Sequence, residues 1–513
     1  MTIQNEKLQK KVWTEHPDQT HQVLIRKILN RDTEHGLPGF AQVDPMNLSA
    51  LAAELNLADP DKQLLPVPIK SIHIGSGGIH TLPNLVSTLT SGTRILLVTD
   101  SVNILCKTES VKEKIHQLLK AHFPTKWLVL SEKNGGDLHA SDEHAKTIAQ
   151  ALTDIDCVVG VGGGTIADLC KYALHTSNVA VPLVLVQTML SVNAFTDGLS
   201  VILKNGVKRT VQSRYPSAVI IDMDVVQQAP FDRTLSGYGD LMATWTAPAD
   251  WLLADTLGMC TKYHHAPYQL LRFQSLELLL YSGDLRAKTG KAFLKLAQVL
   301  TLSGIAMGLT GESSPVSGSE HTISHLLDMA AESQGQALAY HGAQVGVSTL
   351  FMACVWDEFL RTFDPASLDF ETCFPDGAFM EGHIQRVFKG LDPKGKLEQE
   401  CWQDYRKKLE LWHTKKEKTH RIFENWSDAK TELQKKVLPP NLLVECMLQA
   451  GAPTRFCELN PAVDTQKALW AIKNCHLYRS RFTLVDLLFF AGIWNDVFIE
   501  HILTRLERLG AGL

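Results

Sequence analysis

Between about residues 69 and 223, short apolar runs alternate with amphipathic segments, and this alternation limits the possible fold more than any other feature. Short runs rich in Val, Ile and Leu are typical of buried strands, whereas the segments between them have the period of helices. We expect strands at five places: Arg94 to Thr99, Trp127 to Leu130, Cys157 to Val161, Val181 to Val186 and Ala218 to Ile221. Strands separated by helices pair in parallel, so the pattern predicts an α/β fold with a mostly parallel sheet.

The hydrophobic pattern changes after Pro230. Long segments of helical period replace the strand-like runs there, for example Tyr268 to Ser282 and Phe293 to Ala306. We therefore expect three regions: a polar N-terminal extension over 1–66, a Rossmann-like domain over 67–228 and an all-helical domain over 229–513. Residues 365–438 form a charged segment of the last region, which we interpret as solvated helix faces. An active site is expected between the two domains.

Composition excludes several classes of function. The 50 basic and 55 acidic side chains leave a net charge of -5, which supplies no broad positive field for nucleic acid or an anionic membrane. The N-terminus lacks the apolar core of a signal peptide, and the longest apolar runs are too short or too polar to predict a membrane span. Ten cysteines stand singly, without a framework of paired spacings, and are interpreted as free thiols. These features predict a cytoplasmic protein.

A glycine turn follows the third expected strand. The segment from Asp156 to Asp168 reads as a buried strand, three consecutive glycines (Gly162, Gly163, Gly164) and the start of a helix at Thr165. Glycines let backbone amides approach a pyrophosphate closely, and the helix directs its unpaired amides and positive dipole end at the anion. The alternative is a structural turn in which Thr165 and Asp168 form a capping box. A capping box and a phosphate-binding turn can coexist at the same helix start.

Asp100 stands at the end of the first expected strand. A carboxylate in that position can accept hydrogen bonds from the adenosine ribose and repel a 2′-phosphate, which favours NAD over NADP. A strand-end aspartate is also a common turn former, so this signal is weak alone.

Asp240 opens the helical region, while His321 and His325 lie on one expected helix and His341 follows it. One carboxylate and two imidazoles with an open fourth position would make a catalytic Zn²⁺ site. Because positions 321 and 325 are four apart, both histidines share one helix face, and either could be the ligand. A chain with 20 histidines also produces this spacing by chance.

Together these segments resemble the polyol branch of the iron-containing alcohol dehydrogenase and dehydroquinate synthase superfamily, most closely its sn-glycerol-1-phosphate dehydrogenases. The match runs in order over most of residues 70 to 510. Besides the glycine turn it comprises these pieces: Gly75-Ser-Gly-Gly78, Gly237-Tyr-Gly-Asp-Leu-Met242, Ser313-Ser-Pro-Val-Ser-Gly-Ser-Glu-His-Thr-Ile-Ser-His325, His341-Gly342, Gly451-Ala-Pro453 and Arg479-Ser-Arg-Phe-Thr-Leu-Val-Asp-Leu-Leu488.

The resemblance implies roles for particular residues. It places the metal ligands at Asp240, His321 and His341, with His325 beside the substrate. It places the pyrophosphate loop at Gly162 to Asp168 and nicotinamide contacts at Thr188 and Ser191. The implied cofactors are NAD or NADP and Zn²⁺, with Fe²⁺ or Ni²⁺ as alternatives. The implied fold is that of dehydroquinate synthase, a Rossmann-like domain followed by a helical one.

Two positions depart from the family pattern. Asn193 stands where those dehydrogenases usually carry Asp, and an amide cannot act as a charged acceptor. After His341, the usual Gly-Glu is replaced by Gly342-Ala343, which removes a carboxylate that could orient a metal ligand.

The implied reaction is reduction of dihydroxyacetone phosphate, or its reversal, by a homo-oligomeric enzyme. We expect Asn193 to contact the substrate and Lys208, Arg209 and Arg214 to bind its phosphate, although a charged surface hairpin is the alternative for this basic cluster. Two other functions stay open. One is a dehydroquinate synthase-like lyase that uses NAD transiently, and the other is a catalytically silent binding relative.

Overall fold

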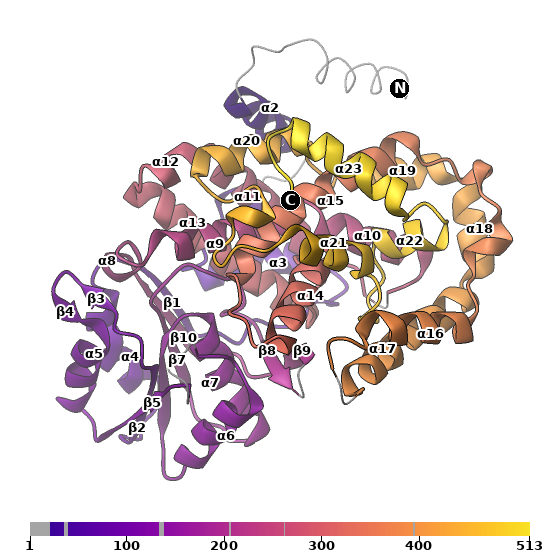
Figure 1. Ribbon diagram of the computed structural model, residues 1–513. Helices are drawn as coiled ribbons and strands as arrows, with labels where there is room; N and C mark the ends of the chain where they lie inside the picture. The colour runs from indigo at the N-terminus through magenta and orange to yellow at the C-terminus, as the bar shows by residue number, and fades with distance from the viewer. Residues whose placement is uncertain (1–20, 35–38, 133–137, 205–206, 261, 393–394) are drawn as a thin grey trace.

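The computed structural model describes residues 21–34, 39–132, 138–204, 207–260, 262–392 and 395–513. Figure 1 shows a sheet with its covering helices at the lower left and a larger body of helices above and to the right of it. The two parts follow one another in the chain. The predicted fold class, a parallel-sheet part followed by a helical part, is confirmed.

Six parallel strands form the main sheet, in the order β1-β10-β7-β6-β2-β5. Their bounds are β1 Ser71–Gly75, β2 Ile95–Asp100, β5 Thr125–Leu130, β6 Cys157–Gly162, β7 Leu183–Gln187 and β10 Ala218–Asp222. All five predicted strands are present with ends that differ by two residues at most. The sequence reading did not assign β1, which is short and runs into the glycines that follow Gly75.

Two short antiparallel pairs accompany the sheet. These are β3 (Leu105–Cys106) with β4 (Glu109–Ser110), and β8 (Leu199–Lys204) with β9 (Val207–Gln212). The second pair carries Lys208 and Arg209, so the basic cluster does lie on a hairpin. The turn residues 205–206, which belong to that cluster's segment, lie outside the described residues.

Helices cover both faces of the sheet because successive strand residues point to opposite sides. Ile95, Leu97 and Val159 pack toward α4 (Leu82–Leu89) and α5 (Val111–Lys120). Leu96, Val98 and Val158 face the other side, which α6 (Asp142–Ala151) and α7 (Gly164–Thr176) cover. Both faces are buried, as a parallel sheet requires.

The strand order reverses direction between β6 and β2, because the chain adds β5 beyond β2 but β7 and β10 beyond β6. In open α/β sheets, ligands bind at the carboxyl ends of the strands beside such a reversal. The glycine turn follows β6 and Asp100 ends β2, so the two predicted nucleotide-binding features meet at this point.

The helical part begins after β10. Its elements are α8 Met223–Val226, α9 Phe231–Met242, α10 Ala247–Leu257, α11 His265–Leu280, α12 Ser282–Arg286, α13 Gly290–Thr310, α14 Ser319–Ser333, α15 His341–Thr362, α16 Gly377–Phe388, α17 Lys396–Thr414, α18 Lys416–Glu424, α19 Trp426–Gln434, α20 Pro440–Ala450, α21 Thr465–Asn474, α22 Leu484–Phe490 and α23 Asp496–Arg508, with short 3-10 turns between some of them.

The charged segment 365–438 forms helices α16 to α19, drawn in orange at the right of Figure 1. The sequence predicted helices with solvated faces in this segment. The helices are present, but some of their faces are buried. In α17, Tyr405 and Trp412 are fully buried, and buried Lys408 forms a 2.5 Å ion pair with Asp486 of α22. This pair joins the segment to the C-terminal helices.

The described part of the N-terminal extension packs on the helical part. It comprises α2 (His21–Glu34), a 3-10 turn at Phe40–Gln42 and α3 (Leu48–Ala58). Gln274 of α11 donates hydrogen bonds to the carbonyls of Phe40 and Ala41. The predicted absence of a signal peptide concerns residues that mostly lie outside the described ones.

All ten cysteines are free thiols, as predicted. Among the described residues, one helix, α13, is long and apolar enough to cross a bilayer by length and composition. Its most apolar window is 89% buried inside the protein, as is typical of a core helix.

Candidate metal centre and nucleotide cleft

Close packing of two helices creates the candidate metal site. Gly239 of α9 lies against the backbone of α15, where a Cβ atom would stand 2.4 Å from the carbonyl oxygen of Gly342. A Cβ at Gly342 would stand 2.1 Å from the carbonyl oxygen of Ser236. Only glycine fits such an approach. The contact places Asp240 of α9 next to His341, the first residue of α15.

Asp240, His321 and His341 each direct one ligand atom to a common point. These atoms lie within 4.8 Å of one another. Nε2 of His321 is 3.5 Å from Oδ1 of Asp240, and Nε2 of His341 is 4.0 Å from the same oxygen. Ligand atoms of tetrahedral Zn²⁺ lie about 3.3 Å apart when bonds are near 2.0 Å. The cluster is therefore slightly wider than a closed metal site.

The two carboxylate oxygens of Asp240 have different surroundings. The backbone N–H of Asn193 donates a 3.1 Å hydrogen bond to Oδ2. Oδ1 is buried and has no hydrogen-bond partner among the described residues. Burying a carboxylate oxygen without a partner is costly, and a bound cation removes that cost. The residues present thus fit a metal ion.

Both ligand histidines are held in the tautomer that a metal needs. Nδ1 of His321 donates to Oε1 of Glu320 at 3.0 Å, which leaves the Nε2 lone pair facing Asp240. Nδ1 of His341 donates to the hydroxyl oxygen of Ser324 at 3.1 Å, and that hydroxyl donates onward to Gln344. Ser324 therefore orients His341, although Ala343 offers no carboxylate for this purpose.

Burial and neighbouring charges set different pKa values for these imidazoles. Burial lowers the pKa of His341 well below its usual value, and nearby cations lower it further. Burial alone would also lower the pKa of His321, but the carboxylates of Asp240 and Glu320 outweigh burial and raise it. An imidazole that binds a metal must be unprotonated at Nε2. A metal ion bound at Asp240 would therefore displace the proton that this carboxylate otherwise favours on His321.

His325 lies beside the triad and outside it. Its ring centroid is 5.3 Å from that of His341 and 6.3 Å from that of His321. An N–H of Arg479 donates to Nδ1 at 2.7 Å. Because arginine has no acceptor, the Nδ1 atom must accept and the neutral ring carries its proton at Nε2. Burial, followed by the charge of Arg479, lowers the pKa of His325 well below its usual value.

The triad and the glycine turn line one cleft of about 830 Å³. Gly163, Gly164 and Thr165 form one wall, and Asp240, His321, His325 and His341 form another. The glycines are needed for space, since a Cβ at Gly164 would stand 2.5 Å from the side chain of Val192. Gly162 lies behind the wall, where a Cβ would meet Ile166.

The helix that starts at the glycine turn is not capped by a side chain. Its N-cap is Gly163, and no side-chain cap hydrogen bond forms, so the alternative of a capping box made by Thr165 and Asp168 does not apply. Asp168 lies in the second turn of α7 and contacts Lys171 at 3.8 Å instead. The amides at the start of α7 stay available to an anion in the cleft, which fits a pyrophosphate.

Lys112 engages Asp100 at the carboxyl end of β2. Its Nζ lies 2.5 Å from Oδ1 of Asp100, which lines the cleft. The ammonium also donates to the backbone carbonyls of Asp100 and Val102. Asp100, which is predicted to accept hydrogen bonds from the ribose, thus forms an ion pair in which Lys112 binds one of its two carboxylate oxygens.

Two predicted nicotinamide contacts lie at the carboxyl end of β7. Ser191 lines the cleft. Thr188 lies just behind it, fully buried, and its hydroxyl has no partner among the described residues. Both remain predictions as cofactor contacts.

The predicted substrate residues have separate surroundings. Asn193 lines the cleft, and its side-chain amide donates to Ser303. Lys208 also lines the cleft and pairs with Asp328 at 2.5 Å. Arg209 pairs with Glu400 and Asp404 of α17, and Arg214 donates to the carbonyl of Val179. Arg209 and Arg214 line no part of this cleft.

Sequence reasoning gave no role to four residues that organise the site. Glu320 precedes a predicted ligand in the Ser-Glu-His motif, and Ser324 lies one helical turn from it, so local spacing could have indicated both. Lys112 follows Asp100 by twelve positions. Arg479 is 154 positions from His325, and no local pattern connects them.

Comparison with known proteins agrees with this geometry. A family model for iron-containing alcohol dehydrogenase matches residues 73–230. Glycerol-1-phosphate dehydrogenase (NAD(P)+) of Bacillus licheniformis is 28% identical over 356 residues, which cover 66% of this chain and 85% of that protein. The protein of the same name from Thermococcus sibiricus is 31% identical over 249 residues, which cover 48% of this chain and 67% of that protein.

Two solved structures share the fold. Glycerol dehydrogenase of Schizosaccharomyces pombe aligns with a TM-score of 0.52 at 16% identity, covering 85% of this chain and 91% of that one. Iron-containing alcohol dehydrogenase of Thermococcus thioreducens aligns with a TM-score of 0.51 at 13% identity, covering 85% and 99%.

The fold and the site define a nucleotide-binding dehydrogenase class with a metal centre, that of the iron-containing alcohol dehydrogenases. Within this class, the similarity to the Thermococcus sibiricus protein and to the other relatives shows that the chain belongs to the glycerol-1-phosphate dehydrogenase family.

Proposed function

We propose that this protein reduces dihydroxyacetone phosphate to sn-glycerol 1-phosphate with NADH, or catalyses the reverse reaction. One observation carries the proposal: the glycine turn and the Asp–His–His triad line the same cleft, so a nucleotide and a metal-bound substrate can meet there. Relatives named glycerol-1-phosphate dehydrogenase support this substrate.

Zn²⁺ is the metal that we propose, held by Asp240, His321 and His341. One carboxylate, two imidazoles and an open position are the donor set of catalytic zinc sites, although Fe²⁺ and Ni²⁺ accept similar ligands. When bound, the ion polarises the substrate carbonyl as a Lewis acid and NADH supplies the hydride. The chain's own contribution is to fix the ligand tautomers through Glu320 and Ser324.

His325 is the residue that we assign to stabilising the product oxygen during proton transfer. Arg479 occupies Nδ1, so the N–H at Nε2 is the group that can donate a hydrogen bond to that oxygen. The low pKa of His325 keeps the ring neutral near pH 7, so the proton that completes the alcohol comes from water. Arg479 thus fixes which nitrogen of His325 acts.

NAD is the nucleotide that we expect, because the carboxylate of Asp100 ends β2 inside the cleft. The free cysteines fit a reducing compartment, which supports a cytoplasmic location.

The purified protein, supplied with Zn²⁺, tests the proposal directly. NADH oxidation should be faster with dihydroxyacetone phosphate than with free dihydroxyacetone. The product should not be a substrate for sn-glycerol-3-phosphate dehydrogenase. Equal or better turnover of the free ketone would point to a general polyol dehydrogenase. The absence of any net NADH oxidation would favour a lyase or a silent binding protein.

A further inference from the structure

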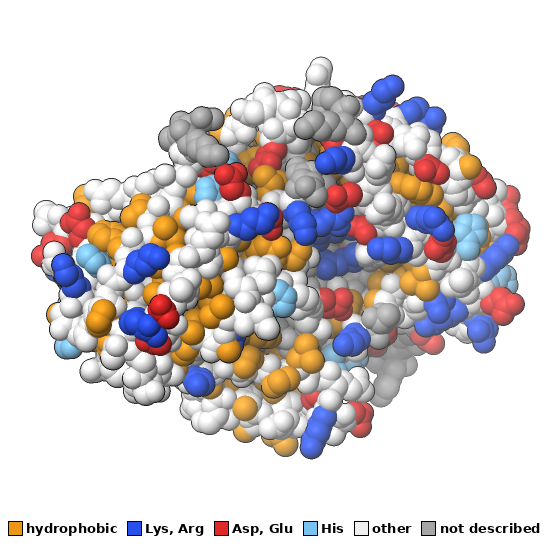
Figure 2. All heavy atoms as spheres, turned by 90° about the horizontal axis from the view of Figure 1, so that it is seen from below, with side chains coloured by type: hydrophobic (Ala, Val, Ile, Leu, Met, Phe, Trp, Pro, Cys, Tyr) orange, Lys and Arg blue, Asp and Glu red, His pale blue; other side chains and the backbone are white. Residues whose placement is uncertain are grey.

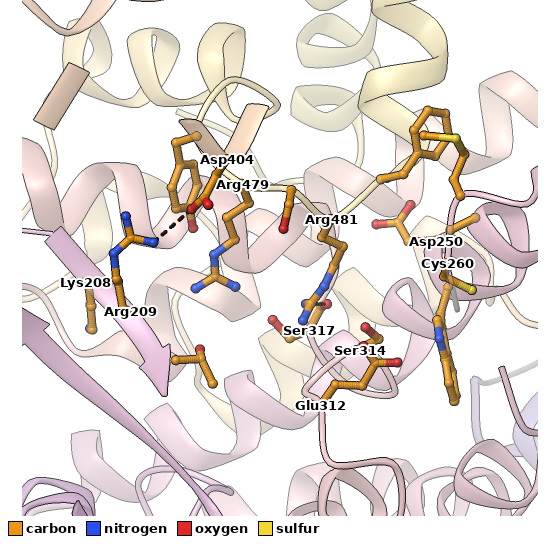
Figure 3. A pocket seen from close by; sticks show the side chains of 17 residues that line it. Lys208, Arg209, Asp250, Cys260, Glu312, Ser314, Ser317, Asp404, Arg479 and Arg481 are labelled. Atoms are coloured by element: carbon orange, nitrogen blue, oxygen red, sulfur yellow. Dashed lines mark hydrogen bonds and ion pairs between the residues drawn. The ribbon is translucent and has the colours of Figure 1, made fainter. Parts of the chain in front are cut away.

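A second pocket of about 450 Å³ adjoins the catalytic cleft. The two cavities share the walls formed by Lys208, Thr210 and Ser317. Figure 3 shows the guanidinium groups of Arg479 and Arg481 projecting into this pocket from the loop that precedes α22. Lys208 and Arg209, two of the three basic residues that the sequence predicted to bind the substrate's phosphate, also line this pocket.

Most charged side chains in the pocket are already paired. Lys208 is bound to Asp328, and Arg209 to Glu400 and Asp404. Asp250 accepts hydrogen bonds from the backbone amides of Ser319 and Leu484. The charges of Lys208 and Arg209 are therefore neutralised within the protein, and Asp250 is satisfied by backbone amides.

Arg481 is also held by the protein. Its guanidinium donates to the carbonyl of Ser317 and to the hydroxyl of Ser313, and the charge of Glu312 lies near it. It therefore forms the fixed back of the pocket.

Arg479 is different, because no carboxylate lies within ion-pair distance of it in the part of the chain that the structure describes. Its one hydrogen bond there goes to Nδ1 of His325, and its guanidinium stands 5.3 Å from the ring of Tyr478. A guanidinium has five N–H donors, so several remain for a ligand.

The two arginines repel each other in the absence of an anion. Burial, together with the positive charge of Arg479, lowers the pKa of Arg481 to about 10. A dianionic ligand between them would relieve this repulsion. Figure 2 shows Lys and Arg side chains gathered across the middle of the molecule's lower face.

We propose that this pocket holds the substrate's phosphate, with Arg479 as its direct ligand and the residue that selects a phosphorylated ketone. The proposal rests on the proposed function. In dihydroxyacetone phosphate only three bonds separate the carbonyl carbon from phosphorus, so the phosphate must lie one side chain away from the catalytic histidines. Arg479, in contact with His325, is at that position.

Two variants test this role, Arg479→Met and Arg479→Lys. We expect Arg479→Met to lower the ratio of kcat/KM for dihydroxyacetone phosphate over free dihydroxyacetone by about 30-fold, which is about 2 kcal/mol at 1.4 kcal/mol per tenfold. Arg479→Lys retains the charge and should lose less of the ratio. If Arg479 acted only through its hydrogen bond to His325, its loss would lower kcat/KM equally for both ketones. The ratio of the two values would then stay unchanged, so the ratio distinguishes this positioning role from phosphate binding.

Arg406→Met is the matched control. Arg406 lies exposed on α17, paired with Glu410, and its loss removes one guanidinium from outside both cavities. Inorganic phosphate provides a second readout, because it should inhibit the wild type competitively with dihydroxyacetone phosphate and inhibit Arg479→Met more weakly.

Failure of this inference is distinguishable from failure of the proposed function. A wild-type enzyme without preference for the phosphorylated ketone overturns the function. A wild-type preference that survives unchanged in both Arg479 variants, with unchanged phosphate inhibition, overturns the role of Arg479 alone.

Discussion

At the scale of single residues, each proposed metal ligand of this site is oriented by a second contact on its other polar atom. The amide of Asn193 occupies one oxygen of Asp240, Glu320 occupies one nitrogen of His321, and Ser324 one nitrogen of His341. The three remaining lone pairs converge. Asn193 thus contributes through its backbone, which explains why an amide side chain at this position is compatible with a metal centre.

Replacing Glu320 by Gln should weaken metal binding while leaving all three ligands in place. Gln has the shape of Glu but lacks the negative charge that makes Nε2 of His321 more basic toward a metal ion. Loss of such a contact typically lowers metal affinity 10- to 100-fold. Competition with a chromophoric chelator measures the dissociation constant. Glu417→Gln, on the exposed face of α18, is the control. Equal affinity in both variants would show that Glu320 does not tune the site.

Replacing Asp100 by Gly should shift cofactor preference toward NADP for two reasons. The carboxylate that disfavours a 2′-phosphate is lost, and the ammonium of Lys112, which it now neutralises, is released. The ratio of kcat/KM for NADH and NADPH measures the change. The double variant Asp100→Gly/Lys112→Met should shift less, because the released cation is absent. A ratio that stays at the wild-type value in Asp100→Gly would remove Asp100 from the ribose site.

At the scale of helices and strands, the sequence predicts what local pattern encodes. Apolar runs identified five strands, and helical periodicity identified α11 and α13, because each burial pattern repeats within a few residues. Local residue type did not decide between the cap and the phosphate-binding turn at the start of α7. Thr165 has the residue type of a capping box, but the helix begins one residue earlier, at Gly164. The pair of Arg209 with α17 spans 191 positions, and no periodicity reports such a contact.

Replacing Gly239 by Ala should damage the metal site without changing a ligand. The added Cβ would lie 2.4 Å from a backbone oxygen of α15, so the two helices must separate and carry Asp240 away from His341. Overpacking of this kind costs about 1–3 kcal/mol. Thermal denaturation and metal content measure both effects. In Gly283→Ala of α12 the new Cβ meets nothing within 4 Å, so this control should keep its metal. Full occupancy in Gly239→Ala would show that the helix contact does not set the ligand positions.

At the scale of the whole molecule, the cleft is built from two parts with separate tasks. The sheet contributes the glycine turn and Asp100, whereas α9, α14 and α15 contribute the three proposed metal ligands. The ligands come from three different helices, so a bound ion links elements that the chain brings together only by folding. The nucleotide site, by contrast, depends on the local sequence β6–turn–α7.

Removal of the metal should therefore have unequal effects on the two halves of the cleft. Chelation should abolish turnover, and Zn²⁺ should restore it, because the ion supplies the carbonyl polarisation. The apoprotein should also unfold at lower temperature, since an ion at 100 times its dissociation constant stabilises the native state by about 2.7 kcal/mol. NADH should still bind to the apoprotein, as nucleotide fluorescence can measure, because the glycine turn is formed by the local sequence β6–turn–α7. Full turnover after verified metal removal would overturn the metal-dependent mechanism, whereas lost NADH binding would show that the two halves of the cleft are coupled.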